Sequence, residues 1–429
     1  MNLDSYRRKL SFYFFIGLIA VSSLSLAASD QSVSPQKLTL PEAIAFGLQH
    51  NPDYKIAEQA VAVAQAQYLQ ARSAIYPQLN LTLESKHTEN SSSGNDSFST
   101  LDAKQALYTF GKLGYAQEYA RYTLRSQEMA LEQTKQLIIY QIKTAFYSVL
   151  LQSELTTVNQ EAVQSAEDHY KTAQLLYEKG VNTLFDATRA KANLANTRSS
   201  LIAAENDLVK EQQNLNQLLN LPPNTRIELI GKLEYHEYQP KVDQLLELAK
   251  LSRPDLKSQM LLYQQSETKL KLRSAQHLPN LYFGADYTLD HADDSDTDHS
   301  WSANINLTMP IFDGYNIANQ VKEAKADVLQ SKLSYDKLQL AVQTQVEQAI
   351  LEIKKQQELI NAAKEAVAVS QLALTMAQAS FKNGLSTSLD VADAELVLTT
   401  AKTNLAQAIY SYLSGLAALE NAIGTTQLP

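Results

Sequence analysis

Apolar residues follow a helical spacing over much of the chain. Between residues 321 and 381 they recur three and four positions apart, as at Leu333, Val346, Ile350 and Ile353. This spacing places them on one face of a helix and is typical of coiled-coil packing. The intervening residues are rich in Ala, Gln, Lys and Glu, which favour helix formation. The pattern therefore predicts long helices that pack closely side by side.

The positions of glycine and proline set the length of these helices. Both residue types break helices, at about 1 and about 3 kcal/mol relative to Ala. Neither occurs in residues 115–179, 181–221, 315–383 or 385–414. We therefore predict two pairs of long helices. At 1.5 Å per residue, the longer helix of each pair should reach roughly 100 Å.

Between residues 279 and 310 the apolar spacing changes to every second residue, which indicates strands. Ile305 and Leu307 alternate there with polar residues, and a weaker alternation occurs in residues 79–84 and 101–107. Four strands of roughly ten residues with one apolar and one polar face fit an outer-membrane barrel. They also fit an ordinary antiparallel sheet with one face packed on a core. The alternation alone leaves both interpretations open.

The chain contains a repeat at an offset of 202 to 204 residues. The segments "NPD", "YPQLNL" and "ALYTFG" are matched later by "RPD", "LPNLYF" and "PIFDGY", and "YEKGVNTLFDA" at 177–187 is matched by "FKNGLSTSLDV" at 381–391. We predict a first repeat over residues 28–221 and a second over residues 241–429. Each should contain a short helix, a medium helix, two strands and two long helices. A connector with some extended structure should occupy residues 222–240.

The N-terminus has the composition of an export signal. Basic residues at positions 7–9 precede an apolar run over residues 10–26 and the small residues "SLAAS". This order predicts a secretory signal peptide over residues 1–27 that is cleaved after Ala27, and the alternative is an uncleaved membrane anchor. No later segment approaches eighteen uninterrupted apolar residues, so we predict no transmembrane helix downstream.

Composition argues against several classes of function. The chain has 429 residues and a formal net charge of −9, which argues against a nucleic-acid partner. It has no Cys, and its seven His are scattered without metal-ligand spacing, so we predict no disulfide and no metal site. No combination of nucleophile, base and orienting residue is present. We therefore expect no enzyme activity, no catalytic residues and no cofactor.

The number of strands constrains the assembly. Four strands cannot close a barrel, and an open sheet edge is not viable in lipid. Several chains must therefore contribute if the sheet lies in a membrane. Two chains would supply eight strands around an interior filled by side chains, whereas three would supply twelve and leave room for a water channel.

Together the signal peptide, the opening "TLPEAIAFGLQHNPD", the repeated segments and the two Gly-to-Asp turns resemble the TolC-like outer-membrane efflux proteins. The resemblance covers nearly all of the mature chain. It implies a mainly α fold with a membrane β-barrel, assembled as a homotrimer. Twelve strands would form the barrel, twelve helices would form a periplasmic tunnel, and the connector would lie in an equatorial belt around it.

The function implied by this resemblance is a passive exit duct of a tripartite efflux or type I secretion system. The duct would lie in the outer membrane of a Gram-negative bacterium and extend into the periplasm. A periplasmic adaptor protein would open it, and an inner-membrane transporter would power export. The alternative is that the chain is itself a periplasmic coiled-coil adaptor. An adaptor needs only one hairpin and substantial soluble β domains, whereas this chain is predicted to have two hairpins and little β structure.

The resemblance places the two Gly-to-Asp turns at the periplasmic ends of the hairpins, in contact with the adaptor. Some family members carry a Tyr and an Arg near the inner turn that bond to the neighbouring hairpin. Phe381 and Ser386 occupy those positions here, so we expect an aromatic contact through Phe381 or Phe185 instead. The residues expected at the adaptor contact are Gly180, Thr183, Phe185, Asp186, Phe381, Gly384, Ser386 and Thr387.

Asp390 and Asp393 lie one helical turn apart, and the resemblance places three copies of this pair around the narrow tunnel mouth. Six carboxylates in a ring would attract cations and repel anions. The alternative is that Asp390 simply caps the helix that follows it. Capping is the favoured role for Asp186.

Aromatic and apolar residues in and beside the strands are expected to face the membrane. Aromatic side chains gather at membrane surfaces, and the alternative for these is ordinary packing beneath the barrel. The residues expected to face the membrane are Tyr282, Phe283, Trp301, Ile305, Leu307 and Phe312.

Overall fold

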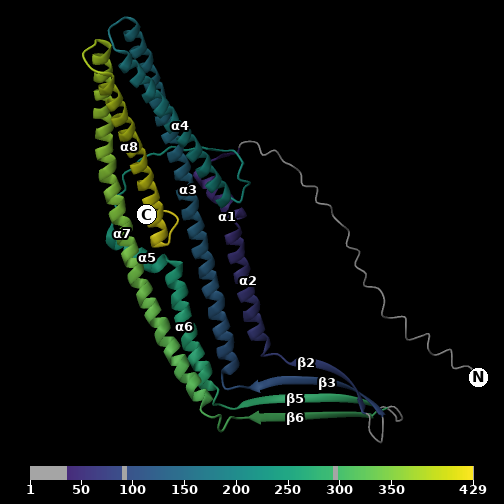
Figure 1. The fold of residues 1–429 in the computed structure, drawn as a ribbon. Helices are drawn as coiled ribbons and strands as arrows, with labels where there is room; N and C mark the ends of the chain where they lie inside the picture. The colour runs from purple at the N-terminus through teal and green to yellow at the C-terminus, as the bar shows by residue number, and fades with distance from the viewer. Residues whose placement is uncertain (1–35, 89–93, 293–297, 429) are drawn as a thin grey trace, which may run out of the picture.

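The computed structural model describes residues 36–88, 94–292 and 298–428, so the expected signal peptide lies outside the described residues. The molecule is a long rod (Figure 1). A four-stranded sheet lies at one end of the rod, and two helix-to-helix turns lie side by side at the other. The fold is mainly helical, as predicted.

The two halves of the chain contain the same series of helices. The first half has α1 (Leu40–His50), α2 (Pro52–Ser73), α3 (Lys112–Glu178) and α4 (Leu184–Leu218). The second has α5 (Val242–Ser252), α6 (Pro254–Ala275), α7 (Asn316–Lys382) and α8 (Ser388–Ile423). Helices α1 and α5 have 11 residues, α2 and α6 have 22, and α3 and α7 have 67.

The long helices predicted from the absence of glycine and proline are thus confirmed. They form two hairpins, in which α3 packs against α4 and α7 packs against α8. Among the described helices, none has a stretch that is long and apolar enough to cross a membrane.

Each hairpin contains an apolar core built from corresponding residues. Ile138, Ile142 and Phe146 of α3 pack with Leu215 of α4 and with Leu219, which follows its last residue. All of these side chains are at most 2% exposed, and burial of one such side chain stabilises the fold by about 1.5–3 kcal/mol. The residues 204 positions later form the second core: Val342, Val346, Ile350, Leu419 and Ile423.

In each half, the residue between the short and the medium helix donates a hydrogen bond to the end of the last helix of that half. Asn51 donates from Nδ2 to the carbonyl of Leu218 at the end of α4 (3.0 Å). At the corresponding position, Arg253 donates from Nη1 to the carbonyl of Ala422 near the end of α8 (2.9 Å). The last carbonyls of a helix lack partners within it. These donors therefore fix the end of each hairpin to the start of its own half.

The connector between the halves is held against the helices. It contains strand β4 (Ile227–Leu229), which pairs in parallel with β1 (Gln36–Leu38). Farther along, the hydroxyl of Tyr412 in α8 donates to the carbonyl of His236 (2.7 Å) and accepts from the N–H of Tyr238 (2.9 Å). These bonds fix the second part of the connector to the second hairpin.

The four long strands form one antiparallel sheet. Its order is β2 (Gln78–Thr88), β3 (Gly94–Tyr108), β5 (Asn280–Ala292) and β6 (Asp298–Thr308). Strands β3 and β5 pair at the centre and so join the two halves, and β2 and β6 form the edges. The prediction of four strands per chain is confirmed.

Gly424 offers a test of the contact between the end of α8 and Arg253. Its φ is +74°, and a Cβ atom there would lie 2.7 Å from the Cα of Arg253. Gly424→Ala should destabilise the protein, because left-handed backbone costs roughly 1–2 kcal/mol and overpacking costs about 1–3 kcal/mol. The midpoint of thermal unfolding, followed by circular dichroism, should fall.

The matched control is Gly114→Ala, in the first turn of α3, where no described atom lies within 4 Å of the added Cβ. Replacing a helical glycine by alanine at this open position should stabilise the protein by roughly 0.5–1 kcal/mol. Equal unfolding midpoints for the two variants would contradict the close contact at Arg253.

Candidate functional site

Each hairpin turn begins with the same backbone motif. The first long helix ends at a glycine with positive φ, Gly180 at +73° and Gly384 at +70°. In the first turn the N–H of Val181 donates to the carbonyl of Leu176, and the N–H of Gly180 donates to that of Tyr177 (both 2.9 Å). The second turn repeats both bonds. This is the Schellman motif, in which glycine adopts left-handed backbone without strain.

The second helix of each hairpin begins with a capping box. Thr183 Oγ1 accepts from the N–H of Asp186 (3.2 Å), and Asp186 Oδ2 accepts from the N–H and hydroxyl of Thr183 (3.3 and 2.6 Å). Thr387 and Asp390 make the same three bonds, at 3.3, 2.7 and 2.8 Å. Both aspartates therefore stabilise the start of their helices.

The bonds from Thr387 also affect the charge of Asp390. They hold the pKa of the Asp390 carboxyl below its usual value, so this carboxylate stays ionised at neutral pH. Asp393 lies three residues farther along α8, and both side chains are exposed. Within the described residues, neither carboxylate forms an ion pair with a Lys or an Arg. The two carboxylates therefore have no cationic partner in the part of the chain that the structure describes.

Exposed apolar side chains cover the ends of both turns. We call Val181, Leu184, Phe185 and Leu385 the tip patch, and each of them is more than half exposed. The two turns lie against each other, because a Cβ atom at Gly384 would be 4.0 Å from Val181 Cγ1. Of these four residues, only Phe185 is among those predicted from the sequence to contact the adaptor. The missed signal was an apolar residue directly after each turn glycine.

Phe381 requires a correction, because it was expected on the surface that contacts the adaptor. It is only 2% exposed, and its ring packs against that of His169 in α3 with the centroids 4.7 Å apart. The expected aromatic contact between the hairpins is thus made by Phe381, whereas Phe185 stays exposed. Ser386 bonds within its own hairpin, donating to the carbonyl of Ala377 (3.3 Å).

A chain of hydrogen bonds farther from the turns links all four long helices. Gln378 of α7 donates to Ser165 Oγ of α3 (3.2 Å), and Ser165 donates to Glu395 Oε1 of α8 (2.7 Å). Asn193 of α4 donates to Glu395 Oε2 (3.1 Å). Nearer the turns, His169 Nε2 and Ser388 Oγ form a further bond between α3 and α8 (2.9 Å). None of these residues was predicted from the sequence.

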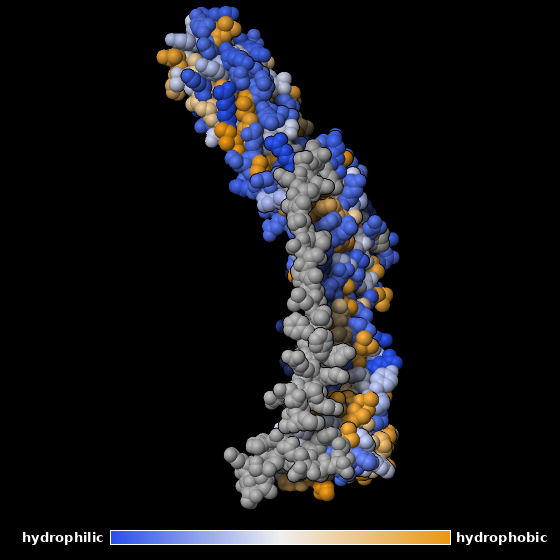
Figure 2. All heavy atoms as spheres, turned by 90° about the vertical axis from the view of Figure 1, so that its right-hand side faces the viewer, coloured by the Kyte–Doolittle hydropathy of each residue, from blue (hydrophilic) through white to orange (hydrophobic). Residues whose placement is uncertain are grey.

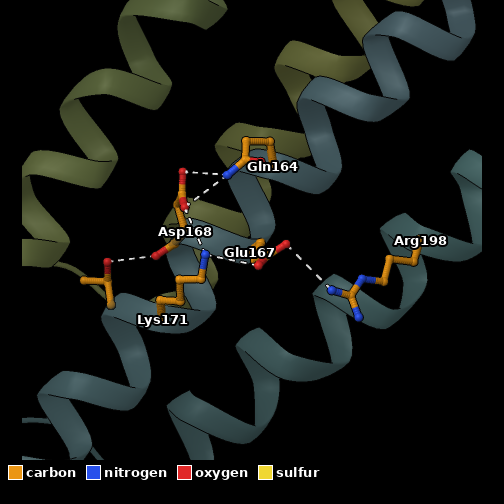
Figure 3. A network of polar contacts seen from close by, with 6 residues as sticks. Gln164, Glu167, Asp168, Lys171 and Arg198 are labelled. Atoms are coloured by element: carbon orange, nitrogen blue, oxygen red, sulfur yellow. Dashed lines mark hydrogen bonds and ion pairs between the residues drawn. The ribbon is translucent and has the colours of Figure 1, made fainter.

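A second polar network joins α3 to α4 on an exposed surface (Figure 3). Lys171 pairs with Glu167 (3.1 Å), which also pairs with Arg198 of α4 (3.7 Å). Gln164 donates to Asp168 (3.3 Å). Exposed ion pairs contribute about 0–1 kcal/mol each. This network therefore marks a solvated face and adds little stability. Figure 2 shows how largely hydrophilic one side of the rod is along its helices.

The sheet has one apolar and one polar face. Phe283, Ile305 and Leu307 share the apolar face with Trp301, which is 75% exposed. No described part of the chain covers this face, so the alternative of an ordinary half-buried sheet is wrong for the single chain. One apolar row across the strands is Leu81, Leu101, Tyr287 and Trp301, and the adjacent polar row is Thr82, Thr100, Thr288 and Ser300.

Tyr282 also requires a correction, because it was grouped with the residues expected to face the membrane. It pairs with Asn306 and therefore lies on the polar face, opposite to Phe283. Lys104 Nζ lies 4.9 Å from the centroid of its ring. Neighbouring residues of a strand point to opposite faces, so Tyr282 and Phe283 cannot lie on the same side. Phe312 lies beyond β6 and is exposed.

Within the described ranges, no group of three or more His, Cys, Asp or Glu side chains is placed to hold a metal ion. The residues that the structure brings together are therefore those of the turns, the hydrogen bonds between hairpins and the two sheet faces.

Comparisons with known proteins agree with this arrangement. The chain is 24% identical to outer membrane protein TolC of Escherichia coli, over 83% of this chain and 76% of that protein. It is 23% identical to nodulation protein T of Rhizobium leguminosarum, over 92% of this chain and 82% of that protein. Its fold is similar to that of the CmeC outer membrane channel of Campylobacter jejuni. There the TM-score is 0.82 at 17% identity, covering 90% of this chain and 85% of the other.

A family model also matches the chain in two segments, one in each half. The model describes outer membrane efflux proteins, and the matched residues are 46–221 and 245–425. Together they include the long helices, both turns and all four strands of the large sheet. The chain therefore belongs to the outer membrane efflux protein family.

Proposed function

We propose that this protein is the outer-membrane exit duct of a tripartite efflux or type I secretion system. The observation that carries the proposal is the sheet at one end of the rod. It has an exposed apolar face, an opposite polar face and two edge strands, β2 and β6, whose outer edges pair with no other strand of the described chain. A sheet of this kind is stable in lipid only when every edge is paired.

A homotrimer would satisfy this requirement. Pairing β2 of one chain with β6 of the next gives twelve strands, enough to enclose a water-filled interior. The apolar face with Trp301, Phe283, Ile305 and Leu307 would contact outer-membrane lipid, and the row of hydroxyls would line the interior. The long helices of three chains would supply the twelve helices of a periplasmic tunnel. A cleaved signal peptide over residues 1–27 would export the chain.

The tips of the hairpins would contact a periplasmic adaptor protein, which links the duct to an inner-membrane transporter. The exposed tip patch supports this role, because clustered apolar side chains on a surface mark sites of protein association. Gly180, Thr183, Asp186, Gly384 and Thr387 shape the two turns, while Phe185 and the other residues of the tip patch offer the contact surface.

Asp390 and Asp393 would form the ring of charge at the tunnel mouth. Capping the helix does not exclude this role, because Asp390 stays exposed and ionised while it accepts its bonds from Thr387. In a trimer the ring would hold six carboxylates that attract cations and repel anions in a confined space.

Paired substitutions in β6 test the assignment of the sheet faces. Ile305→Arg should weaken membrane assembly by about 2–4 kcal/mol if the residue lies near the middle of the bilayer. Asn304→Arg, on the polar face, is the matched control and should be tolerated. The yield of detergent-extracted trimer, measured by light scattering after size exclusion, reports the difference. Equal losses from the two changes would be evidence against a lipid-facing apolar face.

A charge-removing pair of substitutions tests the ring. The purified protein in a planar bilayer should show a small, cation-preferring conductance that a multivalent cation blocks from the periplasmic side. Asp390→Asn together with Asp393→Asn should weaken both properties, because neutral amides remove the charge at nearly unchanged size. The ring is ruled out if this double variant keeps its ion preference and its block. Capping would then be the sole role of Asp390.

A further inference from the structure

Two titratable side chains are buried where the hairpins meet, and the proposed duct makes no use of them. Glu395 of α8 is 7% exposed and His169 of α3 is 5% exposed. Both line one groove of about 490 Å³ between α3, α7 and α8. Each bonds across the hairpin boundary, Glu395 to Ser165 and His169 to Ser388. Separation of the hairpins would break both contacts and expose both groups to water.

Glu395 has only neutral partners, Ser165 of α3 and Asn193 of α4. Within the described residues it forms no ion pair. The charged groups around it are otherwise engaged or lie at the edge of the groove. Lys402 pairs with Glu161 (2.7 Å), and Arg198 of α4 pairs with Glu167 (3.7 Å). The other charged residues lining the groove are Asp168 and Lys382.

The direct contacts of His169 are likewise with uncharged groups. Its Nε2 forms a hydrogen bond with the Ser388 hydroxyl, and its ring packs on that of Phe381. An imidazolium at this position would lose most of its hydration and gain no buried carboxylate within hydrogen-bond distance among the described residues. Both Glu395 and His169 are therefore best accommodated in their neutral forms when the hairpins are packed.

Because Glu395 is an acid and His169 is a base, burial of their neutral forms makes the packing of the hairpins depend on pH in opposite directions. Burial raises the pKa of the Glu395 carboxyl, so its contribution to packing is full at acid pH and is lost as pH rises through the raised pKa. Burial lowers the pKa of the His169 imidazole. Its contribution is full above the ordinary histidine value of about 6.5 and is lost as pH falls through the lowered pKa.

We propose that Glu395 and His169 form an opposed pair at the contact between the two hairpins, so that the contact responds less to pH than it would with either group by itself. Acid strengthens the contact through Glu395 and weakens it through His169. The proposal concerns contacts within one chain, so it does not depend on the trimer, on the adaptor or on conduction.

The chain is well suited to a fluorescence test, because it has no Cys and only one Trp. Val181→Cys labelled with bimane, combined with Leu385→Trp, places a dye and a quencher on the two adjacent turns. Both positions are exposed and belong to the tip patch. Quenching in the full-length purified protein then reports hairpin contact between about pH 5 and pH 9, a range that includes the ordinary histidine value. The same labelled protein with Leu385 retained supplies the reference intensity at each pH.

Three variants should distinguish the pH response of Glu395 from that of His169. In Glu395→Gln, only His169 of the pair can titrate, so quenching should fall as pH falls. In His169→Gln, only Glu395 of the pair can titrate, so quenching should rise as pH falls. With both changes the profile should be nearly flat. The packed-to-separated ratio should change about tenfold for each unit by which a pKa differs between the two states. Asp207→Asn, an exposed carboxylate of α4 that pairs with Lys210 and does not line the groove, is the control and should match the unmodified protein.

The proposal is overturned if the two single variants respond to pH in the same direction, or if both match the unmodified protein. Ser165→Ala provides a second test should Glu395→Gln fail to fold. It removes a donor that favours the carboxylate, and so raises the pKa of Glu395 further. Quenching should then increase more steeply toward acid pH than in the unmodified protein, and an unchanged profile would also count against the pair.

Discussion

Packing along α3 is the interaction on which the rest of the molecule depends. This helix contacts α1, α2 and α4 of its own half and α6 and α8 of the other. It therefore joins the two halves along the helical part of the rod, whereas the sheet joins them only at one end. Ile138, Ile142 and Phe146 give α3 its own apolar core, and polar residues nearer the turns make its bonds to the second hairpin. The same helix thus provides both firm packing and polar contacts between hairpins.

Much of the fold was predictable, because its strongest signals are local. The absence of glycine and proline gave the long helices, and the change of apolar period located the strands. The environments of Phe381 and Glu395 were not predictable, because they depend on how two hairpins align, and spacing within one helix carries no information about that alignment. Tyr282 differs, because its position in the alternation of β5 already indicates the polar face. Only its aromatic character pointed to the membrane.

The turns show how one residue can serve local structure and function together. Thr387 and Asp390 complete the start of α8 by mutual hydrogen bonds, yet these bonds also keep the carboxylate charged and fixed in position. Asp186 makes the same bonds in the first hairpin. Capping is therefore common to both turns. What distinguishes the second turn is Asp393, which adds a second exposed carboxylate one helical turn away.

The equal lengths of α3 and α7 limit how this protein can change in evolution. Both helices have 67 residues, and both run from the sheet to turns that lie side by side. Loss of seven residues from one helix alone would shift its turn by about 10 Å along the rod. The two turns would then end at different heights, and the tip patch would be divided. Insertions and deletions in the long helices should therefore persist only when both halves, and both returning helices, change together.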